Sequence, residues 1–96
     1  MKYIMLKETS NVGVCYVPII FPSALVHSDV ADAMIKSLEV TAKGRTISVD
    51  SAGELSLFGT DFVCHGSSET LGICANSERD TQIIKMNDYG GGLVFR

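Results

Sequence analysis

The chain of 96 residues is 46% hydrophobic and 20% charged, a composition that fits one small folded domain and excludes intrinsic disorder. Its net charge of −3 is uneven, because residues 1–48 carry five basic and four acidic groups and residues 49–96 carry three basic and seven acidic groups. Direct nucleic-acid binding is not expected without clustered cations, nor is a membrane span without a run of about 20 apolar residues.

The first two elements are predicted to be strands, at residues 2–7 and 12–21, joined by a polar turn at 8–11. β-Branched and aromatic side chains are frequent on both sides of this turn. Pro18 cannot donate a ladder hydrogen bond, so the second strand is expected at a sheet edge or to bulge there. An open edge can pair with another chain, which makes Tyr16 and Pro18 the predicted interface residues.

Residues 28–38 carry the clearest helix signal in the sequence. Ser28 is expected to cap the free amides of the first turn. The apolar residues recur at helical spacing and form one stripe: Val30, Ala31, Met34, Ile35 and Leu38. This stripe predicts that one face of the helix packs against the sheet.

Short strands are predicted in the second half of the chain. Alternation at residues 46–50 and 54–58, with a turn at 51–53, predicts a hairpin. Residues 62–65 and 70–74 are candidates for further short strands.

A second, short helix is predicted to begin at Ser77, with Asp80 completing a variant of the capping box. The glycines at 90–92 end this helix. Residues 93–96 are expected to form a last strand or, together with the glycines, a mobile tail at 90–96. The order ββαβββα predicts an α+β fold in a single domain, residues 1–96. We expect an antiparallel sheet of about five strands with two helices on one face.

The loop from His65 to Glu69 combines an imidazole, hydroxyls and a carboxylate. Such a loop can hold a small ligand, although glycine and serine are also the residues of any tight turn. His65, Ser67, Ser68 and Glu69 are therefore the candidate binding residues.

No catalytic residue, metal ligand or cofactor is predicted. Cys64 and His65 are neighbours in an expected strand, so their side chains point to opposite faces and cannot pair. Together with Cys74 and His27 they also lack the close pairing of structural zinc ligands.

The three cysteines, Cys15, Cys64 and Cys74, cannot all pair within one chain. None of them belongs to a CxxC motif. An odd number of widely spaced cysteines favours reduced thiols and a cytoplasmic location over a secreted disulfide framework.

Residues 17–22 (VPIIFP) with 25–31 (LVHSDVA), and residues 64–72 (CHGSSETLG) with the helix at 80–84, resemble small uncharacterised proteins of phages and prophages. The resemblance implies an intracellular accessory protein, either associated with a capsid or modulating a host factor. It implies no catalytic residues.

These observations together predict a non-enzymatic protein-interaction module that binds a host or phage protein or forms a homo-oligomer. The prediction rests on the absence of a catalytic constellation and on the sheet edge expected at Pro18. The alternative is a small-ligand-binding protein or an enzyme that uses the His65–Glu69 loop.

Overall fold

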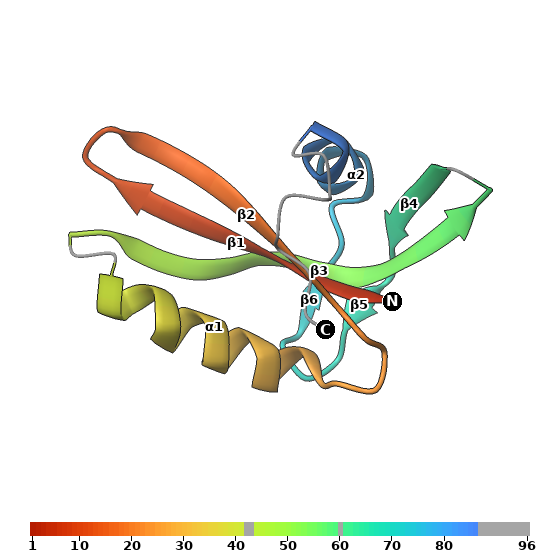
Figure 1. Cartoon of the computed structure of the whole chain (residues 1–96), viewed down its shortest axis with the longest axis horizontal. Coiled ribbons are helices and arrows are strands. Elements are labelled where there is room, and N and C mark those ends of the chain that lie inside the picture. Colours follow the sequence, from red (N-terminus) through yellow and green to blue (C-terminus); the bar gives the residue numbers. More distant parts are fainter. Residues whose placement is uncertain (42–43, 60, 87–96) are drawn as a thin grey trace.

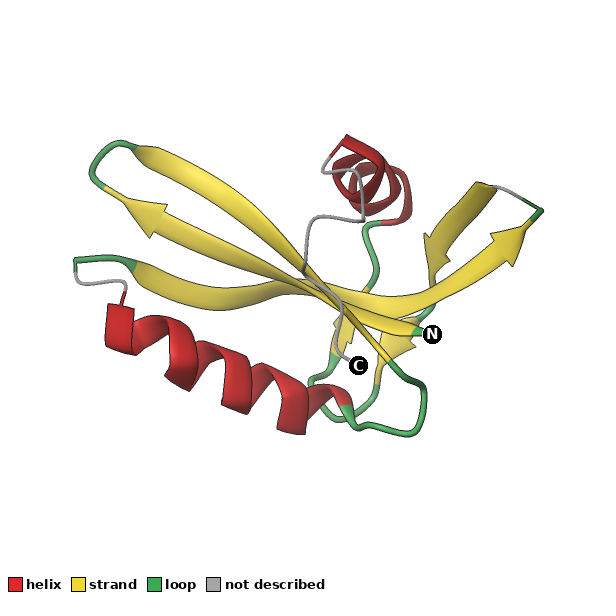
Figure 2. Ribbon diagram, viewed as in Figure 1, coloured by secondary structure: helices red, strands yellow, loops and turns green. Residues whose placement is uncertain are grey.

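The computed structural model describes residues 1–41, 44–59 and 61–86. It confirms the α+β class, with a curled antiparallel sheet of four strands, a separate sheet of two short strands and two helices (Figures 1 and 2). The elements are β1 (Lys2–Ser10), β2 (Gly13–Phe21), α1 (His27–Thr41), β3 (Thr46–Phe58), β4 (Asp61–His65), β5 (Ser67–Ser68), β6 (Ile73–Cys74) and α2 (Ser77–Met86). The large sheet has the order β2-β1-β3-β4, and β5 pairs with β6.

β1 lies inside the sheet and sends apolar side chains to both faces. Ile4 and Leu6 belong to a cluster that includes the apolar stripe of α1, whereas Tyr3 and Met5 belong to a cluster that includes Ile84 of α2. Because successive side chains of a strand alternate, the two helices cover opposite faces of the sheet (Figure 1). The prediction that both helices pack on one face of the sheet is therefore wrong. The continuous apolar run of β1 is the signal of a strand buried on both sides.

β3 is one strand of 13 residues where the sequence predicted a hairpin with its turn at 51–53. Adjacent residues of β1 pair with Ser51 and Val49, which leaves Asp50 as an extra residue in β3. This irregularity is a β-bulge, in which the bulged strand continues while its alternation shifts by one residue. The predicted hairpin is therefore wrong. The shift in the alternation of apolar residues, which suggested a turn, is caused by the bulge.

The bulge also decides which side chains reach α2. Ile47 and Val49 before the bulge and Ala52 after it contact the α1 cluster. Asp50 and Ser51, at the shift itself, both contact Arg79 of α2. The bulge therefore brings two polar side chains onto the face that α2 covers.

The N-terminal hydrogen bonds of both helices differ from the predicted caps, which were Ser28 and Ser77. α1 begins one residue before Ser28, and the Ser28 amide donates to Thr70 Oγ1 at 3.3 Å. At α2 the reciprocal bonds join Asn76 and Asp80: the Asp80 amide donates to the Asn76 carbonyl at 2.8 Å, and the Asn76 amide donates to the Asp80 carboxylate at 3.1 Å. Ser77 instead donates its hydroxyl to the Cys64 carbonyl.

β2 is an edge strand of the large sheet, as Pro18 predicted. The hairpin of β1 and β2 extends to one end of the molecule, beyond the part of the sheet that α2 covers (Figure 1). The strand predicted at 62–65 is present as β4, and the one at 70–74 is reduced to β6. The last strand or tail predicted at 90–96 lies outside the described residues.

Candidate functional site

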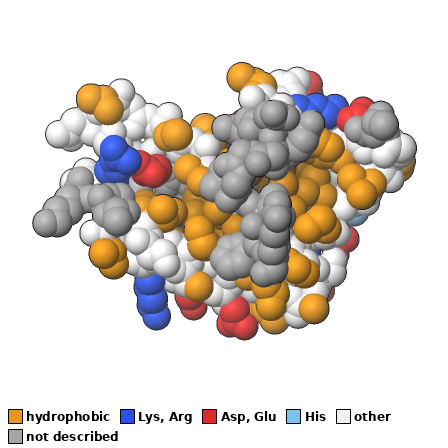
Figure 3. All heavy atoms as spheres, viewed as in Figure 1, with side chains coloured by type: hydrophobic (Ala, Val, Ile, Leu, Met, Phe, Trp, Pro, Cys, Tyr) orange, Lys and Arg blue, Asp and Glu red, His pale blue; other side chains and the backbone are white. Residues whose placement is uncertain are grey.

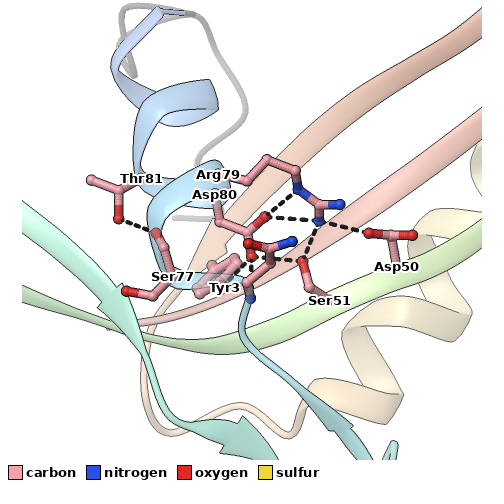
Figure 4. Close-up of polar contacts among 8 residues, drawn as sticks. Tyr3, Asp50, Ser51, Ser77, Arg79, Asp80 and Thr81 are labelled. Carbon is pink, nitrogen blue, oxygen red and sulfur yellow. Dashed lines mark hydrogen bonds and ion pairs between the residues drawn. The ribbon is translucent and has the colours of Figure 1, made fainter.

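A carboxylate that is completely buried, Asp80, lies in the first turn of α2 (Figure 4). Its Oδ2 accepts hydrogen bonds from the Tyr3 hydroxyl at 2.5 Å, the Ser51 hydroxyl at 2.6 Å and the Asn76 amide at 3.1 Å. Its Oδ1 accepts two further bonds from Arg79, at 3.2 Å from Nε and 2.9 Å from Nη2. We call these residues, with Asp50, the Asp80 cluster.

Arg79 connects the Asp80 cluster to the protein surface. Its Nη2 lies 2.6 Å from the carboxylate of Asp50 and donates to the Ser51 hydroxyl at 3.0 Å. Its Cζ lies 4.7 Å from the centre of the Tyr16 ring, within the range of a cation–π interaction. Burial alone would lower the pKa of Arg79, but hydrogen bonds and charges from Asp80 and Asp50 raise it above its usual value. The guanidinium is therefore a permanent positive charge.

Two acidic groups of the buried face are held in their neutral forms. Burial raises the pKa of the Tyr3 phenol, and the hydrogen bond to Asp80 and its charge raise it further. Burial also raises the pKa of the Cys64 thiol to about 11, against a smaller lowering by its interaction with Thr81. A neutral thiol is a poor nucleophile, so Cys64 has the character of a packing residue.

The Asp80 cluster joins α2 to β1 and β3. Each of its buried side-chain oxygen and nitrogen atoms has a hydrogen-bond partner within the described part of the chain. Five donors surround the Asp80 carboxylate, so its lone pairs are occupied by the protein itself. This arrangement stabilises the fold and leaves little capacity for binding a substrate.

The Asp80 cluster was not predicted from the sequence, where Asp80 has only the position of a capping residue. Asp80 does return to a backbone amide at the helix start, as a capping residue does. Ser51, which donates to Asp80, is brought to this face by the bulge at Asp50, and no turn or capping motif in the sequence marks that bulge. The shift in hydrophobic phase between Val49 and Ala52 was the one available signal.

The four candidate residues of the His65–Glu69 loop serve different parts of the structure. The Nε2 atom of His65 lies 2.5 Å from the Ser56 hydroxyl on β3. Ser68 is buried, and its hydroxyl accepts the Leu71 amide at 3.2 Å and lies 3.3 Å from Thr70 Oγ1. The other two are exposed: Ser67 and Glu69. The Nε2 atom of His65 and the hydroxyl of Ser68 are thus used in strand and turn contacts.

The hydrogen bonds at the N-terminus show which residues of β1 bond to which neighbouring strand. The Leu55 amide donates to the Met1 carbonyl at 2.8 Å, and the Met1 amino group lies 3.5 Å from the Leu55 carbonyl. In an antiparallel ladder, alternate residues bond to alternate neighbours. Odd-numbered residues of β1 therefore bond to β3, and even-numbered residues bond to β2.

This alternation continues into β2. Cys15 and Val17 pair with even-numbered residues of β1, so their backbone groups bond inward to the sheet. Val14, Tyr16 and Pro18 alternate with them and direct their backbone groups away from β1, to the open edge. The ring of Pro18 fits this position because its nitrogen has no hydrogen to donate.

The exposed part of this edge lies near the hairpin turn. Val12 and Val14 are 97% and 51% exposed, and Cys15 is also exposed. Of the two predicted interface residues, Pro18 is buried and Tyr16 is half-buried beneath Arg79. No residue of β2 is charged. In Figure 3 apolar side chains lie at the tip of the hairpin, and a blue and a red side chain lie next to each other beside it.

Within residues 1–41, 44–59 and 61–86, no group of three or more His, Cys, Asp or Glu side chains is arranged to hold a metal ion. In the same residues, no helix has the length and apolar character needed to cross a membrane. The chain matches no protein-family model, no curated protein and no solved structure. The resemblance to phage proteins therefore stays a prediction.

Proposed function

We propose that this protein is a non-enzymatic interaction module of the phage-accessory kind, which binds another protein or itself in a reducing compartment. It does so by accepting an additional β-strand on the open edge of β2. The observation that supports this proposal is the outward direction of the backbone groups of Val14 and Tyr16 on an exposed, uncharged edge. Strand addition uses such groups as donors and acceptors.

Edge strands in soluble proteins are usually protected from strand addition by charged side chains, proline or bulges. In β2 the proline is at position 18, in the buried half of the strand. The half nearer the turn, at Val14 and Cys15, has neither a charge nor a proline. An incoming strand therefore fits along residues 13–17 and stops at Pro18.

The enzymatic and small-ligand alternative has less support. The Nε2 atom of His65 and the hydroxyl of Ser68 have partners within the protein. The phenol of Tyr3 and the thiol of Cys64 are neutral near pH 7, and burial raises the pKa of each further above its usual value. The carboxylate of Asp80 is itself completely buried.

A proline substitution tests the proposal at the backbone. Val14→Pro removes the outward N–H, whereas Val14→Thr has nearly the same shape and keeps it. Tagged wild-type protein, both variants and His65→Ala are used to capture partners from the producing cells, and bound proteins are quantified by mass spectrometry. We expect Val14→Pro to reduce specific partners at least tenfold, while the other two variants retain them. Equal capture by Val14→Pro, or loss with His65→Ala alone, would overturn the proposal.

A further inference from the structure

We infer that the partner fitted by this edge is a second copy of the chain, bound by antiparallel pairing of two β2 strands about a two-fold axis at Cys15. The inference rests on the proposed function, because it uses the same open edge. It is supported by hydrogen-bond register, by charge and by the position of the exposed thiol.

The register follows from which backbone groups point outward. With the axis at Cys15, Tyr16 of each copy lies opposite Val14 of the other. Both of these residues direct their N–H and C=O groups to the edge, so each pair exchanges two hydrogen bonds. With the axis at Tyr16, Val14 would instead lie opposite Pro18, whose missing N–H leaves the Val14 carbonyl unpaired.

The charge distribution permits two copies to meet at this edge. β2 itself has no charged residue, and the nearest acid on β1, Glu8, is paired with Arg45. In the paired sheet the two Glu8 positions are three strand spacings apart, about 14 Å, which exceeds the Debye length at physiological ionic strength. The acidic residues of the second half begin at Asp50, and the described residues from there on lie away from the hairpin turn (Figure 1).

The edge is sterically accessible near the hairpin turn, where Val14 and Cys15 of β2 are exposed. The β2 residues that pack with the helices are Val17, Ile19 and Phe21 in the cluster with α1 and Tyr16 and Ile20 in the cluster with α2. Val12 and Val14, at the exposed end, would be partly covered by the second copy. The interface is short, so the dimer is expected to be weak and dependent on concentration.

Cys15 provides a reporter for this arrangement. On the two-fold axis it forms a pair without hydrogen bonds, in which the Cα atoms are about 4.5 Å apart. This distance lies within the range that a disulfide bridges. Cys74 is exposed on β6 and has no part in the proposed interface, whereas Cys64 is buried.

Two measurements test the inference. The first is the weight-average mass by sedimentation from about 10 µM to about 1 mM, the range expected for a small interface. Wild type and Val14→Thr should approach twice the 10.3 kDa of the monomer, and Val14→Pro should not. The second is oxidation with copper phenanthroline, in which Cys74→Ser should form a cross-linked dimer at least tenfold faster than Cys15→Ser.

The outcomes separate this inference from the proposed function. A monomer at every concentration, a dimer that persists in Val14→Pro, or equal cross-linking of the two cysteine variants would overturn the second-copy inference. If the protein is monomeric but captures another protein through a Val14→Pro-sensitive contact, the proposed function stands alone. If neither self-association nor Val14→Pro-sensitive capture is found, both fail.

Discussion

The Asp80 cluster and the β2 edge both present hydrogen-bonding groups, and they differ in where those groups find partners. In the Asp80 cluster, Tyr3, Ser51 and Arg79 direct their donors to one buried carboxylate. At the β2 edge, the backbone groups of Val14 and Tyr16 point away from the sheet. The first region is closed by the fold, and the second is left to water or to another strand. Removal of a group should therefore reduce stability in the first region and association in the second.

The largest expected effect is the loss of the Asp80 charge. Asp80→Asn leaves the guanidinium of Arg79 without its buried partner and places an amide among donors, which should lower the free energy of unfolding by about 3–5 kcal/mol. Urea unfolding followed by circular dichroism measures this change. Glu78→Gln, an exposed acid in the same helical turn, is the matched control and should cost about 0.5 kcal/mol. A similar decrease in the free energy of unfolding for the two variants would show that the buried contacts of Asp80 do not stabilise the fold.

The second largest effect is expected at alkaline pH, where ionisation of the buried groups Cys64 and Tyr3 should lower the free energy of unfolding. Burial raises the pKa of Cys64 from 9.0 to about 11 in the folded protein, so the unfolded chain releases this proton at lower pH. The free energy of unfolding should be fully retained below pH 9 and fall between pH 9 and 11, by up to about 3 kcal/mol. The raised pKa of Tyr3 has the same sign and should extend the fall above pH 10.

Urea unfolding at pH 8, 9, 10 and 11 checks this pH dependence, and Cys64→Ala is its control. The variant should be less stable at pH 8 because a buried side chain is shortened. Its stability should nevertheless fall less between pH 9 and 10 than that of the wild type. Parallel profiles for the two proteins would show that the thiol does not contribute.

A smaller effect is expected at Gly53, where β3 passes close to β4. A Cβ at this position would lie 2.3 Å from the carbonyl oxygen of His65, and a backbone atom cannot move aside without shifting its strand. Gly53→Ala should therefore lower the free energy of unfolding by about 2 kcal/mol. Ser48→Ala, at an exposed position of the same strand, should change it by less than about 0.5 kcal/mol in the same assay.

The sequence predicted the features with local signals and missed those that depend on register. The hairpin of β1 and β2, the apolar stripe of α1 and the edge position of Pro18 each follow from spacing or from the chemistry of one residue. The bulge at Asp50 could not be predicted in this way, because the small residues at 51–53 are as typical of turns as of close contacts between strands. The burial of Asp80 depends on that bulge and on pairing across the sheet. The opposite faces of the helices follow instead from the alternation of β1, whose continuous apolar run is a local signal.

The smallest effects are expected for the backbone N–H groups of β2, which point either toward β1 or away from it. Cys15→Pro removes an N–H that bonds inward to β1, and it should lower the free energy of unfolding by about 1–2 kcal/mol. Val14→Pro removes an outward N–H at a similarly exposed neighbouring position, and the change should be less than about 0.5 kcal/mol. Urea unfolding of both variants measures the difference under conditions where the protein is monomeric. Equal losses would mean that the Val14 amide already has a partner within the chain, which would remove the open edge on which the proposed function depends.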